Sequence, residues 1–153
     1  MANTYTQIHI QSVFAVKYRT ALIQTAWKDD LHKYITGIIQ NNNHKLLSIN
    51  SMPDHIHIFF GFRPMQSLAD LIRMIKSDSS EWINKNNLCS SAFHWQDGYG
   101  AFSYSRSHIS AVCTYIENQE KHHVKQPFLE EYKEMLQKFQ IGYDEKYIFK
   151  LPE

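Results

Sequence analysis

The sequence has few of the residues that would mark a disulfide-rich, secreted or membrane-spanning protein. Its two cysteines, Cys89 and Cys113, lie far apart and form no C-x-x-C pair. One disulfide is therefore possible, but a secreted fold built on disulfides is excluded. No apolar run approaches the ~18 residues of a membrane span, and the N-terminus lacks a basic head followed by an apolar core. We expect no signal peptide and no membrane association, and a cytoplasmic protein with reduced thiols.

The sequence also has few glycines and prolines, and its net charge is close to zero. Five glycines and four prolines form no linker, repeat or low-complexity tract, so we expect a single domain over residues 1–153. A chain of this length buries roughly two-thirds of its unfolded surface without help from disulfides or metals. Sixteen Lys+Arg against fifteen Asp+Glu give a net charge of +1. That balance neither indicates nor excludes a nucleic-acid partner, because a basic face can lie on a neutral molecule.

Apolar periodicity predicts an ordered series of strands and helices. Ile8, Ile10, Phe14 and Val16 recur at period two, which is typical of a strand and places one over 6–16. Further along the chain, helical spacing, turn residues and caps predict seven more elements. They are a helix over 27–40, strands over 45–50 and 55–62, a helix over 68–83 capped by Ser67, a glycine-punctuated segment over 93–105 that leads into a strand, a helix over 108–123 capped by Ser107, and a helix from Pro127 to about Phe139.

The resulting order is β-α-β-β-α-β-α-α, in which helices alternate with a small number of strands. This order predicts an α+β fold with a central antiparallel sheet. We expect the helices to cover one face of that sheet.

A pair of histidines stands out in the strand predicted over 55–62, "HIHIFFGF". Side chains alternate along a strand, so His55, His57 and Phe59 share one face while Ile56, Ile58 and Phe60 share the other, apolar face. Two imidazoles one strand repeat apart are close enough to bind one metal ion. The pattern is short and common, however, and two half-exposed histidines at a sheet edge would also produce it. Two ligands are too few for a closed structural zinc site.

The helix predicted over 108–123 carries a second polar group. Ile109, Val112, Cys113 and Ile116 form its buried stripe, and Tyr115, Gln119 and His122 lie along one flank of that stripe. A phenol and a carboxamide thus stand one turn apart at the boundary between core and solvent. A boundary tyrosine with polar neighbours is the simplest interpretation of this helix taken alone.

Together, "MPDHIHI" and "YIENQEKHH" resemble the single-tyrosine HUH transposases, the TnpA-type enzymes of insertion sequences that move as single-stranded DNA, and their REP-associated relatives. His55-Ile56-His57 corresponds to the H-U-H motif (U is apolar) of that family. Tyr115 corresponds to its catalytic tyrosine and Gln119 to its third metal ligand. The segments "GYGAFSYS" and "YDEKYIF" are also similar, so the resemblance covers nearly the whole chain.

The resemblance implies a ferredoxin-like or RRM-like palm with a C-terminal helix that carries the tyrosine. It implies cleavage and rejoining of single-stranded DNA through a 5′-phosphotyrosine, with recognition of DNA hairpins. It also implies a homodimer in which the tyrosine helix of one subunit serves the histidine pair of the other. In that arrangement Gly98 and Gly100 are candidate hinges of a movable arm.

The chemistry of the four residues is consistent with that activity. A phenol is neutral at pH 7, and the phosphodiester that it attacks is anionic. A divalent cation on a non-bridging oxygen offsets this charge and orients the phosphate. Two imidazoles alone favour zinc or manganese over magnesium, whereas the resemblance implies Mg²⁺ with Mn²⁺ as a substitute. We expect Mg²⁺ to be the physiological ion and Mn²⁺ to bind more tightly.

Contacts to single-stranded DNA are expected from cations that bind phosphates and from aromatic rings that stack on bases. Tyr18, Phe102 and Tyr104 are the candidate stacking residues, although each could equally belong to the core. The candidate phosphate contacts, each of which could also be an ordinary surface charge, are Lys17, Arg19, Arg73, Lys76, Arg106 and His122, with Arg63 and Lys121 as weaker ones.

Three other functions fit parts of the pattern. A domesticated protein that only binds DNA hairpins would have no reason to keep the nucleophile Tyr115. A single-strand nickase of the replication-initiator kind would use the same chemistry, but usually within a longer chain. A zinc hydrolase is disfavoured because the sequence places no evident carboxylate beside the histidine pair as a general base.

Overall fold

The computed structural model describes residues 4–121 and 126–143. Four strands form one antiparallel sheet in the order β2-β3-β1-β4. They are β1 (His9–Ala15), β2 (Lys45–Met52), β3 (His55–Gly61) and β4 (Gly100–Tyr104). Two helices, α1 (Thr25–Asn41) and α2 (Leu68–Lys85), connect them in the order β-α-β-β-α-β. This is the ferredoxin-like arrangement, which confirms the predicted fold class.

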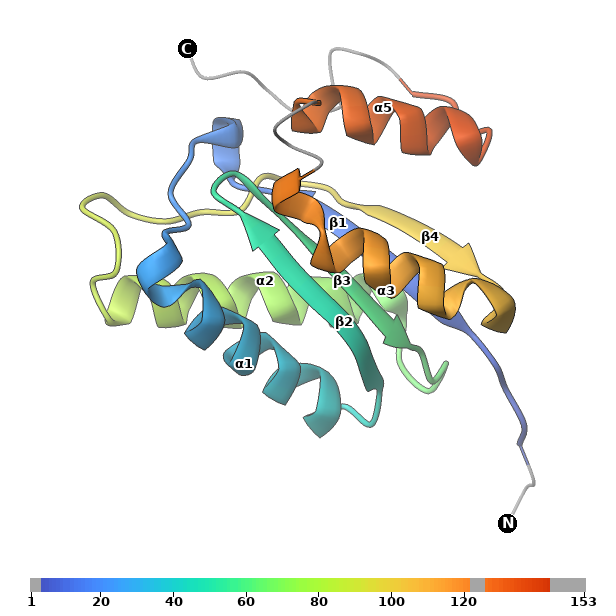
Figure 1. Ribbon diagram of the computed structural model, residues 1–153. Coiled ribbons are helices and arrows are strands. Elements are labelled where there is room, and N and C mark those ends of the chain that lie inside the picture. The colour runs from blue at the N-terminus through green and yellow to red at the C-terminus, as the bar shows by residue number, and fades with distance from the viewer. Residues whose placement is uncertain (1–3, 122–125, 144–153) are drawn as a thin grey trace.

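The C-terminal third of the chain adds helices to the opposite face of the sheet. A 3₁₀ turn, η2 (Arg106–His108), leads into α3 (Ile109–Glu117), and α5 (Phe128–Lys138) follows. Figure 1 shows α1 and α2 on one side of the sheet and α3 and α5 on the other. The expectation that helices cover only one face is therefore wrong: both faces of the sheet are apolar enough to need a cover. α5, which follows the tyrosine helix, confirms the helix predicted from Pro127 to about Phe139.

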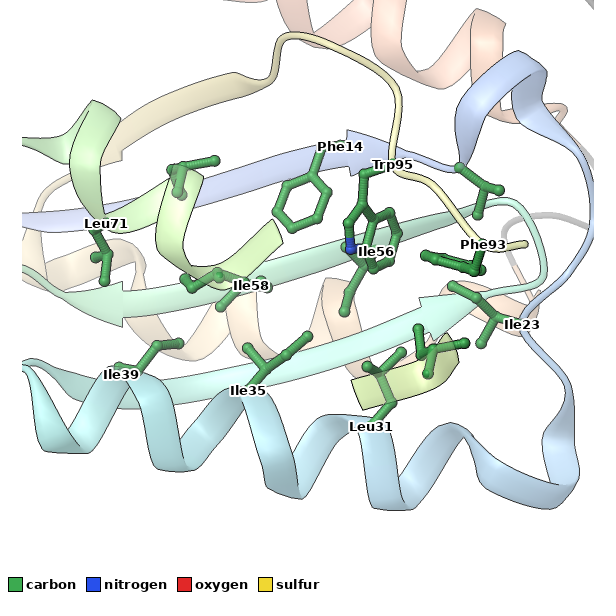
Figure 2. Packing of buried hydrophobic residues seen from close by; sticks show 14 of the residues in the cluster. Phe14, Ile23, Leu31, Ile35, Ile39, Ile56, Ile58, Leu71, Phe93 and Trp95 are labelled. Carbon is green, nitrogen blue, oxygen red and sulfur yellow. The ribbon is translucent and has the colours of Figure 1, made fainter. Parts of the chain in front are cut away.

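The main core lies between the sheet and the helix pair α1 and α2. Ile56, Ile58 and Phe60 of β3 point into it, as the alternation predicted, together with Phe14 of β1. Figure 2 shows Phe14 beside Trp95 and Phe93, which come from the segment that leads into β4. The rings of Phe14 and Trp95 meet edge to face with centroids 4.9 Å apart, a favoured aromatic geometry. This core fixes β3 and thereby the direction of its other face.

One predicted helix cap is confirmed, whereas a second cap and the end of one helix are corrected. Ser67 caps α2, because its Oγ accepts a hydrogen bond from the backbone N–H of Asp70 at 3.0 Å. Ser107 caps nothing: it lies within η2, and His108 is the N-cap of α3 without a side-chain hydrogen bond. The tyrosine helix is shorter than predicted and ends at Glu117, with Asn118 as its C-cap.

None of the helices within residues 4–121 and 126–143 combines the length and the apolar character needed to cross a bilayer.

Candidate active site

The histidine pair lies on an interior strand and faces α3 and α5. β3 is flanked by β2 and β1, and both His55 and His57 are fully buried. The alternative of two half-exposed histidines at a sheet edge is therefore wrong. Their rings meet at an angle of 74° with centroids 5.2 Å apart, so both point to the same side of the sheet.

Each histidine is oriented by a hydrogen bond at Nδ1. His55 Nδ1 lies 2.6 Å from a carboxylate oxygen of Asp54, and His57 Nδ1 lies 2.7 Å from Oε1 of Gln11 on β1. Both partners are acceptors, so each Nδ1 carries the proton. Each Nε2 faces the site, as in metal-binding histidines that have an outer hydrogen-bond partner.

Helix α3 brings Tyr115 beside the pair. Its buried residues Val112 and Ile116 pack against Phe59 of β3, and the side chain of Asn50 on β2 donates to the carbonyl of Ile116 at 2.9 Å. The ring of Tyr115 consequently lies 6.0 Å, centroid to centroid, from that of His57. The tyrosine of this chain reaches the histidines of the same chain, whereas the resemblance implied those of a partner subunit.

Gln119 also reaches the site, although it lies beyond the end of α3. It is fully buried, and its Oε1 lies 3.3 Å from Nε2 of His55. The sequence predicted that Tyr115 and Gln119 lie one turn apart on the same helix. In the structure α3 ends at Glu117 and Asn118 is its C-cap, so the two residues do not belong to one continuous helix.

A fifth residue, Glu131 of α5, completes the cluster and was missed in the sequence. Its side chain is nearly fully buried. One carboxylate oxygen lies 3.2 Å from Nε2 of His57 and 3.9 Å from Nε2 of His55. The other accepts hydrogen bonds from the Tyr115 hydroxyl and from the amide of Gln119. The expectation that no carboxylate stands beside the pair is therefore wrong.

A signal for Glu131 was present in the sequence. In α5 the apolar residues Phe128, Tyr132, Met135 and Leu136 recur at helical spacing and are all buried. Glu131 falls within that stripe, where a charged side chain is rarely placed unless it has a partner. A lone carboxylate on an apolar helix face is the pattern that would have identified it.

The cluster has the donor set of a divalent metal site. One ligand atom each from His55, His57 and Glu131 lie within 4.8 Å of one another, and Oε1 of Gln119 faces the same region. Nε2 of His55 lies 3.3 Å from Oε1 of Gln119, and Nε2 of His57 lies 3.2 Å from Oε1 of Glu131, so nitrogen and oxygen atoms that can bind a cation face one another. Two imidazoles with a carboxylate and an amide oxygen suit divalent metals such as manganese and zinc.

The protein environment keeps Tyr115 protonated. Burial, the negative charge of Glu131 and the hydrogen bond to Glu131 raise the pKa of the Tyr115 phenol far above its ordinary value. A phenol in this state needs an adjacent base before it can act as a nucleophile. Glu131 is the acceptor already in contact with its hydroxyl.

A cavity of about 400 Å³ lies between α3 and α5 and reaches these residues. Tyr115, Glu131, Gln11 and Tyr104 line it. On the other side of the cluster, Phe128 stacks on the imidazole of His55 with centroids 3.9 Å apart. Access to Tyr115 is therefore from the cavity, while Phe128 covers His55.

The predicted DNA-contacting cations fall on different parts of the surface. Arg73 is exposed on α2 and pairs with Asp70. The ammonium of Lys76 donates to the carbonyls of Gln96 and Gly98, and burial lowers the pKa of Lys76 to about 8. Lys76 thus holds the segment before β4. Lys17 and Arg19 lie in a 3₁₀ turn, η1 (Lys17–Arg19), at the end of β1.

Arg106 lies in η2, and Arg63 lies two residues beyond the end of β3. Lys121 is exposed. His122 lies outside the described residues, as does most of the predicted closing segment "YDEKYIF".

The aromatic and glycine candidates are also resolved. Phe102 is buried against α5, so the expectation that it stacks on DNA is wrong. Tyr104 accepts a hydrogen bond from Gln11 at 3.0 Å, and Tyr18 is partly exposed. Gly98 has a φ of +87° and suits a turn. Gly100 is a poor hinge, because it is the first residue of β4 and pairs with Val13.

Comparison with known proteins places this cluster in context. A family model described as "Transposase IS200 like" matches residues 4–119. The ISDra2 transposase TnpA of Deinococcus radiodurans is 24% identical over 119 residues, which are 74% of this chain and 84% of that protein.

Two solved structures are similar in fold. One is a crystal structure of a protein assigned as a transposase from Deinococcus radiodurans R1, with a TM-score of 0.61, 21% identity, and coverage of 78% of this chain and 95% of that one. The other is a REP-associated tyrosine transposase bound to a REP hairpin, with a TM-score of 0.60, 13% identity, and coverage of 80% and 73%.

Proposed function

This chain belongs to the IS200-like transposase family, and we propose that it cleaves and rejoins single-stranded DNA through attack of Tyr115 on a phosphodiester. The observation that carries the proposal is the convergence of the Tyr115 hydroxyl, the Nε2 atoms of His55 and His57, and the carboxylate of Glu131, of which Tyr115 and Glu131 also line a cavity. A nucleophile and a proton acceptor thus line a cavity and adjoin a buried set of possible metal ligands.

In the proposed reaction Oη of Tyr115 forms a bond to phosphorus and the 3′-oxygen of the neighbouring nucleotide leaves. Glu131 takes the phenolic proton through the oxygen that already accepts its hydrogen bond. The leaving 3′-oxygen takes up a proton from water, so the products are a 5′-phosphotyrosine and a free 3′-hydroxyl. Because the ester conserves the energy of the broken bond, a second transesterification to another 3′-hydroxyl rejoins the strand without ATP.

The metal in this proposal is Mg²⁺, with Mn²⁺ as a substitute. His55 and His57 would hold it through Nε2, Gln119 through Oε1, and Glu131 through the oxygen nearest His57. When bound, it would offset the phosphodiester charge and orient the scissile phosphate. Asp54 and Gln11 fix the two imidazoles through Nδ1, and the amide of Gln119 donates to Glu131, which orients its oxygen toward His55.

We further propose that the substrate carries DNA hairpins. The REP-associated tyrosine transposase of the same fold is bound to a REP hairpin, which supports this partner. A homodimer remains a prediction from the resemblance, but the site does not need one, because one chain supplies all five residues. Reaction on chromosomal DNA would place the protein in the cytoplasm.

The test mixes the purified protein with Mg²⁺ and labelled single-stranded hairpin oligonucleotides from the genomic flanks of its gene. A denaturing gel is expected to show a covalent protein–DNA adduct. Tyr115→Phe should abolish the adduct and leave hairpin binding intact. Tyr34→Phe is the control, because Tyr34 stacks on Trp82 of α2 and does not line this cavity.

Two results would contradict the proposal. An adduct that persists in Tyr115→Phe would show that another residue is the nucleophile. Hairpin binding by the wild type without cleavage under Mg²⁺ or Mn²⁺ would instead identify a hairpin-binding protein that has lost catalysis.

A further inference from the structure

The turn that follows β1 has a strained backbone that the core does not explain. Tyr18 and Arg19 have φ values of 60° and 54°, a left-handed conformation that is unfavourable for residues with a side chain. Glycine would adopt it without strain. Neither residue belongs to a core cluster: Tyr18 is 38% exposed, and Arg19 is only partly buried. Strain of this kind is often retained at functional sites, where it fixes the direction of side chains.

Hydrogen bonds from neighbouring segments hold the turn in this conformation. The N–H of Val16 donates to the carbonyl of Asp54 at 2.9 Å, and the N–H of Lys17 donates to the carbonyl of His94 at 2.9 Å. The N–H of Arg19 donates back to Val16 at 2.7 Å. The turn is therefore held from both sides and presents its three side chains from a fixed backbone.

The side chains of the turn form a cationic surface with one aromatic face. The ammonium of Lys17 lies 5.4 Å from the centre of the Tyr18 ring. The Nε of Arg19 is buried, and no hydrogen-bond partner is found for it among residues 4–121 and 126–143. Within the same residues, no carboxylate forms an ion pair with Lys17 or Arg19. Two cations without anionic partners, next to a partly exposed ring, fit a phosphate and a nucleobase.

The turn lies at the end of the sheet where the histidine pair begins. Ala15 of β1 pairs with His55, so Lys17 lies two residues, or about 7 Å of strand, beyond that pair. Asp54 connects the two regions, because its carbonyl accepts from Val16 and its carboxylate orients His55. Figure 1 shows the turn, in blue after β1, near the connection between β2 and β3.

We propose that the Lys17–Arg19 turn binds an unpaired nucleotide of the single-stranded DNA substrate, at the His55 end of the sheet and outside the cavity that reaches Tyr115. The base stacks on the ring of Tyr18, and the guanidinium of Arg19, with Lys17, binds the phosphate of that nucleotide. The proposal rests on the proposed function for the identity of the substrate, but the binding chemistry is separate from catalysis. The turn would hold a flanking part of the strand without contacting the reacting atoms.

The first test measures binding of fluorescein-labelled (dT)₁₅, and of an abasic strand of the same length, to Tyr115→Phe protein by fluorescence anisotropy. Added to that background, Tyr18→Ala should weaken (dT)₁₅ binding at least fivefold, because stacking on an aromatic residue is lost, and should leave abasic-strand binding unchanged. Arg19→Gln should weaken binding of both strands and reduce the salt dependence by about one phosphate contact. Tyr99→Ala, at a matched 37% exposure, and Lys33→Gln, at an exposed position of α1, are the controls and should change neither.

Stability distinguishes this function from a structural one. Tyr18→Gly relieves the left-handed strain, so its Tm should not fall even though (dT)₁₅ binding is lost. The proposal is overturned if the Tyr18 variants bind (dT)₁₅ as the Tyr115→Phe parent does, or if that parent does not bind (dT)₁₅ at all. Equal losses in the Tyr99 control would also overturn it.

Cleavage separates this inference from the proposed function. In single-turnover assays with the flanking hairpin oligonucleotide, Tyr18→Ala should require more DNA for half-maximal adduct formation and keep the maximal rate. Unchanged DNA dependence alongside normal wild-type adduct would overturn the nucleotide site alone. Loss of (dT)₁₅ binding in Tyr18→Ala, with no adduct from wild type, would support the site and overturn the proposed function.

Discussion

The hydroxyl of Tyr115 on α3 donates a hydrogen bond to the carboxylate of Glu131 on α5, across 16 residues of sequence. The same carboxylate contacts His57 of β3. The side chain of Glu131 therefore joins α5 to both α3 and β3. The contact couples the position of α5 to the protonation of the tyrosine and to the geometry of the candidate metal ligands.

Glu131→Gln is expected to weaken binding of a divalent metal. Loss of outer-sphere partners in metal sites costs about 10–100-fold in affinity, and loss of a negatively charged ligand should cost at least as much. Titration with Mn²⁺, followed by electron paramagnetic resonance, measures the affinity without DNA. Glu134→Gln is the control, because Glu134 is exposed on the same helix. Equal affinity of the two variants would exclude Glu131 as a ligand.

Gln11→Leu is expected to disturb the orientation of His57. The substitution removes the acceptor for Nδ1 of His57 and the donor to the Tyr104 hydroxyl. We expect metal affinity to fall about 10–100-fold and the free energy of unfolding to fall by about 1–3 kcal/mol, since buried polar groups lose their partners. Mn²⁺ titration and urea denaturation measure the two effects. Gln40→Leu, at an exposed position of α1, should change neither, and an unaltered affinity in Gln11→Leu would remove its positioning role.

His32 should make the protein less stable in acid. Burial, followed by the nearby charge of Lys28, lowers the pKa of His32 to about 4, and its Nε2 lies 2.8 Å from the hydroxyl of Ser51. The unfolded chain binds this proton near pH 6.5, so between pH 6.5 and 4 it binds more protons than the folded chain. The free energy of unfolding should therefore decrease as the pH falls through this range.

The contribution of His32 is about 1–2 kcal/mol after allowance for its partial exposure. In urea denaturation at pH 4.5 and 7.5, His32→Gln should reduce the difference between the two pH values by this amount. Substitution of the exposed His94 by Gln should leave the difference unchanged. If the free energy of unfolding of His32→Gln depends on pH as strongly as that of the wild type, other groups cause the loss of stability in acid.

Gly100→Ala should disturb the packing of α5 on β4. A Cβ at this position would lie 2.6 Å from the hydroxyl oxygen of Tyr132, which is buried in α5. Overpacking of this kind costs about 1–3 kcal/mol, and the shift of α5 should also weaken Mn²⁺ binding through Glu131. The double variant with Tyr132→Leu should lose less stability than the sum of the single variants.

Gly37→Ala is the matched control for this substitution. No atom lies within 4 Å of a Cβ at Gly37, and alanine is favoured within a helix by about 0.5–1 kcal/mol. Thermal denaturation should therefore show a higher Tm for Gly37→Ala and a lower Tm for Gly100→Ala. Equal Tm values would mean that Tyr132 moves aside without cost.

Features of the fold that depend on neighbouring residues could be predicted from the sequence, whereas features that depend on residues distant in sequence could not. Strand alternation and helix periodicity are local, so the faces of β3, the stripe of α2 and the Ser67 cap followed directly from neighbouring residues. The end of α3 did not, because it is set by the cap at Asn118 and by the hydrogen bond that Asn50 makes from β2. Local pattern also could not show that helices cover both faces.

The candidate chemistry of the site could be predicted from the sequence alone. The spacing of His55 and His57 and the order in which Tyr115 and Gln119 follow depend only on chain connectivity and residue type. The packing of the fold was needed to show that Tyr115 lies beside the histidines of its own chain and that Glu131 adjoins them. Burial of a carboxylate depends on which face of the sheet α5 covers, and that packing is set by residues distant in sequence, such as Phe102 and Val13.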